Sequence, residues 1–498
     1  MPSTQINVYS AVPIPRDLSH HIYSSSIADF ESKLSDYLLK SYNALSYQRY
    51  QRTVKIEEKM EFIYDANYLE IIEDNEKFFA FIDDYLYIND KTVEISYTID
   101  AIATFLWSGK VILGQSFVDR CHSKTDEIGD NLLSEAFGDN LEMVYYRTTE
   151  SGIVDQEKAS IIVQSSVNLN ELSNETGFLL EKTFQGIGYF GYKTTEIDDL
   201  KLALSDLENE NKSDGVIKMY MFPSDFYYVI AKQINGIAGK GYRFNKCYEP
   251  FGSYVPKNNK IFTYPYNFLV VDNSEGDQIE YHYEYFSTDY CPFYCYPQIS
   301  GTPSLTLMPN GYYHSPEPSF SISMDDFPQC AWSSDYYKAW LAQNSGAFAV
   351  KSLSSLAMAL TNSAGIAGSV LLNSASNFVA ESLSAKNHAP SVHSSGTNSA
   401  FWDMSRKDFY FICKRLNEES ARVVDAFWTQ YGYPQKKVMD IPLHNRESFT
   451  YVKTSGCNAY GNAPRNFIDV IKNAFDSGIT FWVNPATMYQ YELSNNTL

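Results

Sequence analysis

The side chains that could bind a metal ion gather between His282 and His314. Cys291 and Cys295 lie four residues apart, with one histidine before them and one after them. Cysteine and histidine are the usual zinc ligands, but this spacing matches no closed zinc site and the surrounding residues are aromatic. We therefore predict that the two cysteines are buried core residues, and we expect no metal or other cofactor.

Three glycines have the spacing of a dinucleotide-binding fingerprint. Gly186, Gly188 and Gly191 occur in the stretch QGIGYFGYK. The fingerprint requires a helix directly after the glycines, because the helix N-terminus holds the pyrophosphate. Strand-like aromatic residues follow here instead, so the stretch does not predict a nucleotide site. The segment AGKG at 238–241 lacks the first glycine and the following Ser or Thr of a phosphate-binding loop.

Neighbouring acids offer a third chemistry. Asp325 and Asp326 lie beside aromatic residues, and sugar hydrolysis uses two carboxyl groups next to an aromatic platform. The chain contains 60 acidic residues, so such pairs arise by chance, and we expect these two in a turn before Pro328. His20 and His21 are adjacent, so on a strand they point to opposite faces and do not share a metal. The motifs G-x-S-x-G and H-E-x-x-H are absent. We expect a protein that is not an enzyme.

The composition indicates a β-rich globular protein with an acidic surface. The 498 residues include 40 Tyr and 31 Phe, and aromatic residues favour strands. The formal net charge of -21 argues against binding nucleic acid through phosphate neutralisation. Seven cysteines do not pair into a disulfide framework, which predicts folding in a reducing cytoplasm. The first residues lack the basic and apolar regions of a secretory signal.

One segment differs from the rest of the chain. Residues 352–380, between Lys351 and Glu381, contain no charged residue, histidine or proline, although 20% of the chain is charged. The segment is long enough to cross a bilayer, but Ser, Thr and Asn are frequent in it, which weakens that interpretation. Its small residues permit close packing against copies of itself. The alternative is a buried core helix rich in Ala and Ser.

The N-terminal part reads as strands and helices in the order β-α-β-β-α-β. The two helices are expected to begin at Asp65 and Asp100 as N-caps, and the second to end at Gly109. After a first strand at 6–14, the expected elements are a strand at 52–63, a helix at 65–74, a hairpin of 77–88 and 91–99, a helix at 100–109 and a strand at 111–121.

The C-terminal part shows the same order. Asn417 and Gly432 are expected to cap one helix, and Pro464 and Gly478 to border the other. The expected elements are a strand at 408–416, a helix at 417–432, strands at 435–443 and 448–460, a helix at 463–478 and a strand at 479–485.

These patterns predict a multi-domain α+β fold that is rich in strands, with two β-α-β-β-α-β modules around inserted domains and a long loop. A helix is expected in the acidic run 198–215, and strands in the aromatic run 260–327. The predicted divisions are an N-terminal module at 1–122, an inserted α+β domain at 123–259, an aromatic-rich β domain at 260–344, the uncharged loop with its flanks at 345–400 and a C-terminal module at 401–498.

Several stretches, in colinear order, are similar to a known family. They are AFWTQYGYPQKKV at 426–438, SFTYVKTSGC at 448–457, FDSGITFW at 475–482, SYTIDAIATFLW at 96–107 and KFFAFIDD at 77–84. The chain resembles the tail knob, or distal tail tube, proteins of small short-tailed phages that infect Gram-positive bacteria. Residues 123–255 carry almost none of the resemblance.

The resemblance implies a structural protein at the tail tip of the virion, made in the host cytoplasm. Six copies would form a tube plugged by hydrophobic loops, which exit on infection, penetrate the host membrane and allow genome ejection. The implied partners are other copies in a homo-hexamer, the upper tail tube, a tip hydrolase, host membrane lipid and genomic DNA that passes through without specific binding. The implied membrane-active side chains are Phe348, Leu353, Leu356, Met358, Leu360, Ile366, Val370, Leu371, Leu372, Phe378 and Val379.

An alternative comes from the tyrosines of residues 260–320. Their rings could stack on sugars, which would make the protein a tail adhesin that binds cell-wall carbohydrate. Packing along strands explains the same alternation of tyrosines.

Overall fold

The chain folds into two compact units in the computed structural model, and each unit combines distant segments. Unit 1 consists of Met1–Glu142, Pro250–Thr263 and Leu416–Leu498, and unit 2 of Met143–Glu249 and Tyr264–Arg415. The structure describes residues 4–135, 137, 141–147, 159–169, 187–230, 232–300, 302–313, 320–325, 327, 329–331 and 407–498. The uncharged loop at 345–400 lies outside these residues, and the five-part division of the chain stays a prediction.

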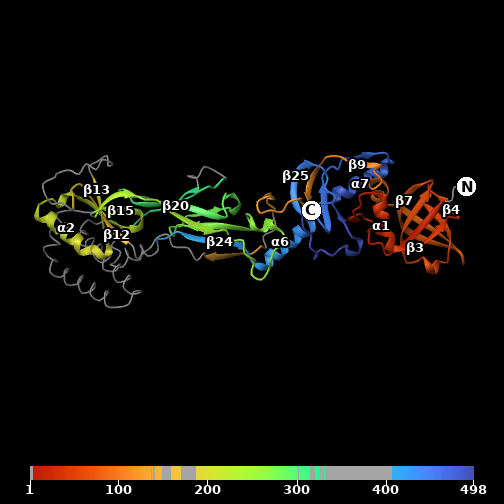
Figure 1. Cartoon of the computed structure of the whole chain (residues 1–498), viewed down its shortest axis with the longest axis horizontal. Helices are drawn as coiled ribbons and strands as arrows, with labels where there is room; N and C mark the ends of the chain where they lie inside the picture. Colours follow the sequence, from red (N-terminus) through yellow and green to blue (C-terminus); the bar gives the residue numbers. More distant parts are fainter. Residues whose placement is uncertain are drawn as a thin grey trace, which may run out of the picture. The chain divides into compact units, whose positions relative to one another are not determined.

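A seven-stranded antiparallel sheet forms one part of unit 1 (Figure 1, where β3, β4 and β7 are labelled). Side chains alternate between two cores along its central strands: Phe78 and Ala80 face one cluster, Phe79 and Phe81 the other. The predicted hairpin is confirmed, with β7 paired to β8. In sheet order the strands are β3 (Leu38–Asn43), β1 (Gln5–Ser10), β6 (Ala66–Glu73), β7 (Glu76–Asn89), β8 (Thr92–Ile99), β5 (Thr53–Glu57) and β4 (Ser46–Gln48).

The predicted helix at 65–74 is wrong, because these residues form strand β6 between β1 and β7. Leu and Glu are good helix formers, but strand pairing on both sides satisfies the backbone groups, and this tertiary effect overrides local propensity. Glu70 is buried on β6, where its carboxylate accepts hydrogen bonds of 2.8 Å from Tyr9 and Asn7. The N-terminal order β-α-β-β-α-β is therefore wrong as well. A short helix, α1 (Ile27–Leu34), was not expected.

A five-stranded sheet forms the second part of unit 1. The predicted strand at 111–121 is two strands in different sheets: β9 (Val111–Leu113) pairs with β27 (Ala459–Gly461), while β10 lies in the five-stranded sheet. The chain turns between them at Gly114, where a Cβ would lie 2.5 Å from the Asn458 side chain. In sheet order the strands are β2 (His20–Ile22), β28 (Ile479–Trp482), β26 (Phe449–Thr454), β10 (Ser116–Cys121) and β25 (Tyr433–Met439).

The helices of unit 1 largely confirm the predicted caps. Helix α6 (Glu418–Tyr431) begins at Asn417, whose side chain accepts from Ser420 N, and ends at Gly432. Helix α7 (Arg465–Ser477) lies between Pro464 and Gly478 and packs beside β26. The expected helix at 100–109 is a π-helical turn at Ile102–Leu106. None of the helices in the described ranges combines the length and the apolarity needed to cross a membrane.

Strand β24 (Tyr410–Leu416) was expected in the C-terminal module, but it pairs with β18 in unit 2. The element types predicted from 408 to 485 are thus confirmed except at 448–460, where one expected strand is two strands, β26 and β27, in different sheets. Their grouping into one packed module is not confirmed. All six residues of β18, Asn267–Asp272, pair in register with β24. The local sequence pattern of β24 cannot reveal this partner.

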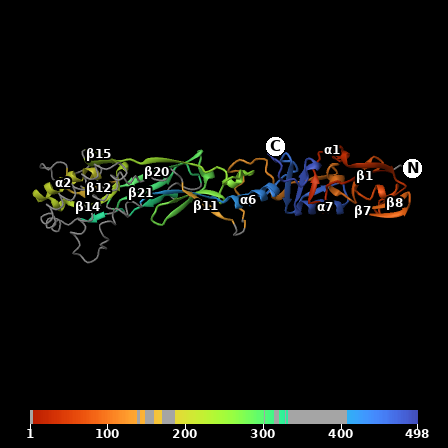
Figure 2. The same cartoon turned by 90° about the horizontal axis from the view of Figure 1, so that it is seen from below.

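The described residues of unit 2 form three sheets that share an aromatic core, including Tyr281, Phe293 and Phe411. Helix α2 (Ile197–Asn209) confirms the helix expected in the acidic run and packs against the six-stranded sheet, near β12 and β14 in Figure 2. One sheet is β11 (Met143–Arg147), β24, β18 (Asn267–Asp272) and β19 (Gln278–Tyr281). The second is β17 (Lys240–Asn245), β20 (Tyr290–Gln298), β21 (Ser304–Pro309) and β22 (Ile322–Met324). The third is β15 (Tyr227–Ile230), β16 (Gln233–Ile237), β13 (Gly188–Lys193), β12 (Ala159–Ser165), β14 (Val216–Pro223) and β23 (Gln329–Ala331).

Candidate functional site

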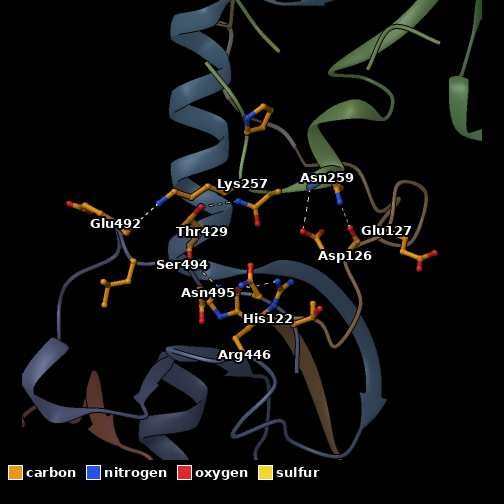
Figure 3. A pocket seen from close by; sticks show the side chains of 15 residues that line it. His122, Asp126, Glu127, Lys257, Asn259, Thr429, Arg446, Glu492, Ser494 and Asn495 are labelled. Carbon is orange, nitrogen blue, oxygen red and sulfur yellow. Dashed lines mark hydrogen bonds between the residues drawn. The ribbon is translucent and has the colours of Figure 1, made fainter. Parts of the chain in front are cut away.

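A cavity of about 640 Å³ lies in unit 1, where segments far apart in the sequence meet (Figure 3). The end of β10, the segment before η8 (Asn259–Phe262), the last turn of α6 and the C-terminal residues all contribute to its wall. Its lining residues are His122, Asp126, Glu127, Pro256, Lys257, Asn258, Asn259, Thr429, Arg446, Glu492, Leu493, Ser494, Asn495, Asn496 and Thr497.

His122 follows β10 and is buried in the wall of the cavity. Its Nδ1 accepts a hydrogen bond of 2.7 Å from the backbone N of Tyr451, so its Nε2 carries the proton and donates to the carbonyl of Thr429 at 3.1 Å. Burial, reinforced by the positive charge of Arg446, lowers the pKa of His122 to about 3. The ring is therefore neutral at physiological pH.

Asp425 on α6 attaches the segment 250–263 to the helix. It is fully buried and accepts hydrogen bonds from the backbone N of Lys257 at 2.8 Å and of Asn258 at 3.0 Å, and from the Tyr254 hydroxyl. The Asn258 side chain donates to the same carboxylate at 2.9 Å. Because a buried carboxylate needs several donors, this cluster fixes the segment that forms one side of the cavity.

Arg446 is the least satisfied residue of the wall. It is 5% exposed, and its Nη1 donates to the carbonyl of Asn495 at a long 3.4 Å. Its Nε and Nη2 are buried and find no acceptor among the described residues. Burial raises the pKa of nearby Asp126, although a hydrogen bond from Tyr433 and the charge of Arg446 act in the opposite direction. Figure 3 shows Arg446, His122 and Asn495 close together at one end of the cavity.

The cavity has the features of a structural polar pocket. Among its lining residues, the ring nitrogens of His122 are occupied by backbone groups, so no hydroxyl is activated by this imidazole. No group of three His, Cys, Asp or Glu side chains in the described part of the chain could hold a metal ion.

The predicted chemical candidates lie in separate places. Cys291 and Cys295 are fully buried in the core of unit 2, as predicted, and His282 stacks on Tyr264 with ring centroids 3.8 Å apart. His314 lies outside the described residues. The strand-like character of the glycine stretch is confirmed by β13, which holds two of its glycines.

The remaining predicted positions are either dispersed or not described. His20 is partly buried against Tyr491, while His21 is fully buried and 3.0 Å from Asp100, which confirms that the two rings point apart. Asp325 donates its backbone N–H to Glu275 at 3.0 Å. Gly186, Asp326 and all eleven side chains proposed to be membrane-active lie outside the described residues.

The sequence did not point to the residues that line the cavity or to those that hold its wall in place. Asp425 occurs in a helix with many polar residues, and Arg446 lies in a loop without any motif. Asp425 matters because it is buried and bonded to residues more than a hundred positions away, and Arg446 because it is buried near His122; only the fold creates these contacts.

The class of protein follows from two comparisons. Residues 2–110 match the family described as the caudoviral major tail protein N-terminus. The structure of the tail knob protein gp12 of bacteriophage C1 matches with a TM-score of 0.64, covering 99% of this chain and 100% of that one. Sequence identity is 11%, so this second match shows the fold alone. The fold is that of a phage tail protein.

The family is shown by the C-terminal half. Residues 230–496, more than half of the chain, match the C-terminal domain of the tail knob protein gp9 of Bacillus phage phi29, and the chain belongs to this tail knob family. Tail knob protein gp9 of Bacillus phage B103 is 35% identical over 97 residues, and that of Bacillus phage PZA is 30% identical over 141 residues. The B103 segment spans 19% of this chain and 16% of that relative, and the PZA segment spans 28% of this chain and 23% of that relative. The protein is therefore a structural component of the virion tail.

Proposed function

We propose that this protein forms the tip of the phage tail as a hexameric tube, through which the genome leaves. Membership of the tail knob family is the observation that carries the proposal. The net charge of -21 supports it, because an acidic wall repels DNA and lets it slide without sticking. The match of residues 2–110 to a major tail protein is consistent with assembly beside other tail components.

The tip of the β7–β8 hairpin is a candidate contact between subunits. Leu86, Tyr87 and Ile88 are 58%, 54% and 41% exposed there. Adjacent exposed apolar side chains are unfavourable in water and typically mark an interaction site. Leu86→Asp together with Ile88→Asp is expected to keep the chain folded as a monomer. A ring that persists in this variant, measured by light scattering and negative-stain microscopy, would exclude the hairpin from the contact.

The uncharged segment is proposed as the plug and membrane-active loop. Residues 352–380 carry no charge, and their apolar side chains would be exposed on leaving the tube, where lipid can cover them. We expect the purified protein to release dye from anionic liposomes. A variant with 352–380 replaced by a Gly/Ser linker should retain its circular dichroism spectrum and ring assembly but release no dye. Equal release by both proteins would remove the membrane role of this segment.

Carbohydrate binding remains the second candidate, favoured by one observation. Tyr294 and Tyr296 on β20 point outward, are 40% and 47% exposed, and stack with ring centroids 6.1 Å apart. Two exposed rings on one face of β20, with an angle of 27° between their planes, form a platform on which a sugar could stack. Retention on purified cell walls that is lost in the Tyr294→Ala, Tyr296→Ala double variant would support an adhesin. Retention unchanged by the double variant would exclude this platform.

A further inference from the structure

Two cysteines of unit 2 lie against the same asparagine side chain. Cys413 is on β24 and is 1% exposed, while Cys247 follows β17 and is partly exposed. The Asn267 amide donates to the carbonyl of Cys247 at 2.7 Å, and its oxygen lies 3.6 Å from the Cys413 sulfur. Cys413 and Arg415 point to the same buried face of β24, and Arg415 contacts the Cys247 sulfur from that face. The two cysteine side chains therefore belong to one cluster.

A buried cation adjoins the pair. Arg415, two residues after Cys413 on β24, is 4% exposed, and its Nη1 donates to the sulfur of Cys247 at 3.5 Å. Its Nη2 donates to the carbonyl of Glu249 at 2.7 Å, which fixes the guanidinium in place. The hydrogen bond from Cys413 and the charge of Arg415 lower the pKa of Cys247 below that of an ordinary thiol, although burial opposes this shift. A lowered pKa increases the share of the thiolate at neutral pH, the form that reacts with disulfides.

We propose that Cys247 and Cys413 form a thiol–disulfide exchange site, which accepts a small-molecule disulfide and closes into a bond between the two cysteines. The Cys247 thiolate attacks one sulfur of a disulfide such as oxidised glutathione, giving a mixed disulfide and one free glutathione thiolate, which takes up a proton. Cys413 then loses its proton and attacks the Cys247 sulfur, which releases the second glutathione as its thiol. Two protein thiols are oxidised, and one small disulfide is reduced to two thiols.

The environment of Cys413 favours this second step. In the free protein, the hydrogen bond to Cys247 and burial raise the pKa of Cys413, and the negative charge of Cys247 adds to the effect. Once Cys247 is in a mixed disulfide it is neutral, and the charge of Arg415 then favours ionisation of Cys413. A virion protein made in a reducing cytoplasm meets an oxidising medium after release, so a pair of this kind closes outside the cell.

The other buried cysteines of unit 2 serve as an internal control. Burial raises the pKa of Cys291 to about 12, and Cys295 is equally buried in the apolar core. At neutral pH these two thiols are protonated and shielded. Cys291 and Cys295 should therefore stay reduced in the native protein, and alkylation of Cys247 should be at least about 10-fold faster than that of Cys291.

The test uses the reduced full chain, treated with oxidised glutathione at pH 7.5 and mapped by mass spectrometry without reduction. We expect a peptide pair joined through Cys247 and Cys413. Cys413→Ser should stop at a glutathione adduct on Cys247, and Cys247→Ser should leave Cys413 unmodified. Iodoacetamide labelling of Cys247 in the native protein should follow pH with a midpoint below that of an ordinary exposed thiol.

Several results would overturn the proposal. One is that Cys247 is labelled no faster than Cys291. Another is that the glutathione adduct on Cys247 persists in the native sequence. A third is that a linked peptide still forms in the Cys413→Ser variant, through another cysteine. Arg415→Gln, which retains a hydrogen-bond donor but removes the charge, should raise the midpoint of labelling. An unchanged midpoint in that variant would remove Arg415 from the site.

Discussion

His122 makes the stability of unit 1 sensitive to acid. In the unfolded chain a histidine has a pKa near 6.5, whereas His122 in the fold has a pKa of about 3. Between these two values the unfolded state binds one proton more than the folded state, so stability falls as pH falls. At pH 5, which is 1.5 units below the unfolded pKa of 6.5, the loss of stability is about 2 kcal/mol, because each unit contributes about 1.36 kcal/mol. This loss does not depend on how far below 5 the pKa of the folded state lies.

The variant His122→Asn isolates this contribution. The Asn oxygen can take the place of Nδ1 and accept from the backbone N of Tyr451, but the side chain does not titrate. We expect the variant to be less stable than the native protein at pH 7.5 by about 1–2 kcal/mol, because the bond to Thr429 is lost. At pH 5 this difference should shrink by about 2 kcal/mol, since only the native protein is destabilised there.

Two measurements check the prediction. Urea unfolding at pH 7.5 and pH 5.0 gives the stability difference, and hydrogen exchange of the peptide containing Tyr451 reports on the amide that His122 holds. His444→Asn is the control, because His444 is only half-buried against Tyr23 and should change the pH dependence much less. If the native protein and His122→Asn lose the same stability between the two pH values, the argument from burial of a neutral ring is refuted.

Three further substitutions test other parts of unit 1 by urea unfolding. Asp425→Asn should cost about 2–4 kcal/mol, because an amide NH2 would face donors of the segment 250–263, and no loss would contradict its anchoring role. Gly432→Ala should cost about 3–5 kcal/mol, since φ is 65° and the new Cβ would lie 2.3 Å from backbone atoms, whereas Gly456→Ala, at φ 79° in open space, should cost only about 1 kcal/mol. Equal costs would refute the steric argument. Burial opposes ionisation of Asp100, but its hydrogen-bonded partners lower its pKa overall. Asp100→Asn should therefore cost about 2–4 kcal/mol of stability at pH 7 and progressively less below pH 3.8. A cost that stays constant with pH would exclude this linkage.

Local patterns predicted the C-terminal elements well. The caps of α6 at Asn417 and Gly432, and the limits of α7 at Pro464 and Gly478, were correct because capping depends on residues within one turn of the helix end. The alternation of polar and apolar residues likewise predicted the β7–β8 hairpin. The colinear similarity of short stretches identified the tail knob family, which the match over 230–496 confirms.

Long-range pairing decided the rest. Residues 66–73 have helix-forming side chains but form a strand, because β1 and β7 supply partners on both sides. Strand β24 was recognised as a strand, but its sheet was not, since β18 lies far from it in the sequence.

The sequence by itself determined the β-rich composition, the acidic charge, most helix ends in the C-terminal part and the family, because each of these depends on composition or on neighbours along the chain. Only the tertiary structure decided which strands pair, and it alone brought His122 and Arg446 to one cavity, Asp425 to the segment 250–263 and Cys247 to the β24 residues Cys413 and Arg415. The physical reason is that burial and contacts between distant residues set the pKa values and hydrogen bonds of these groups, and neither is encoded in a local pattern.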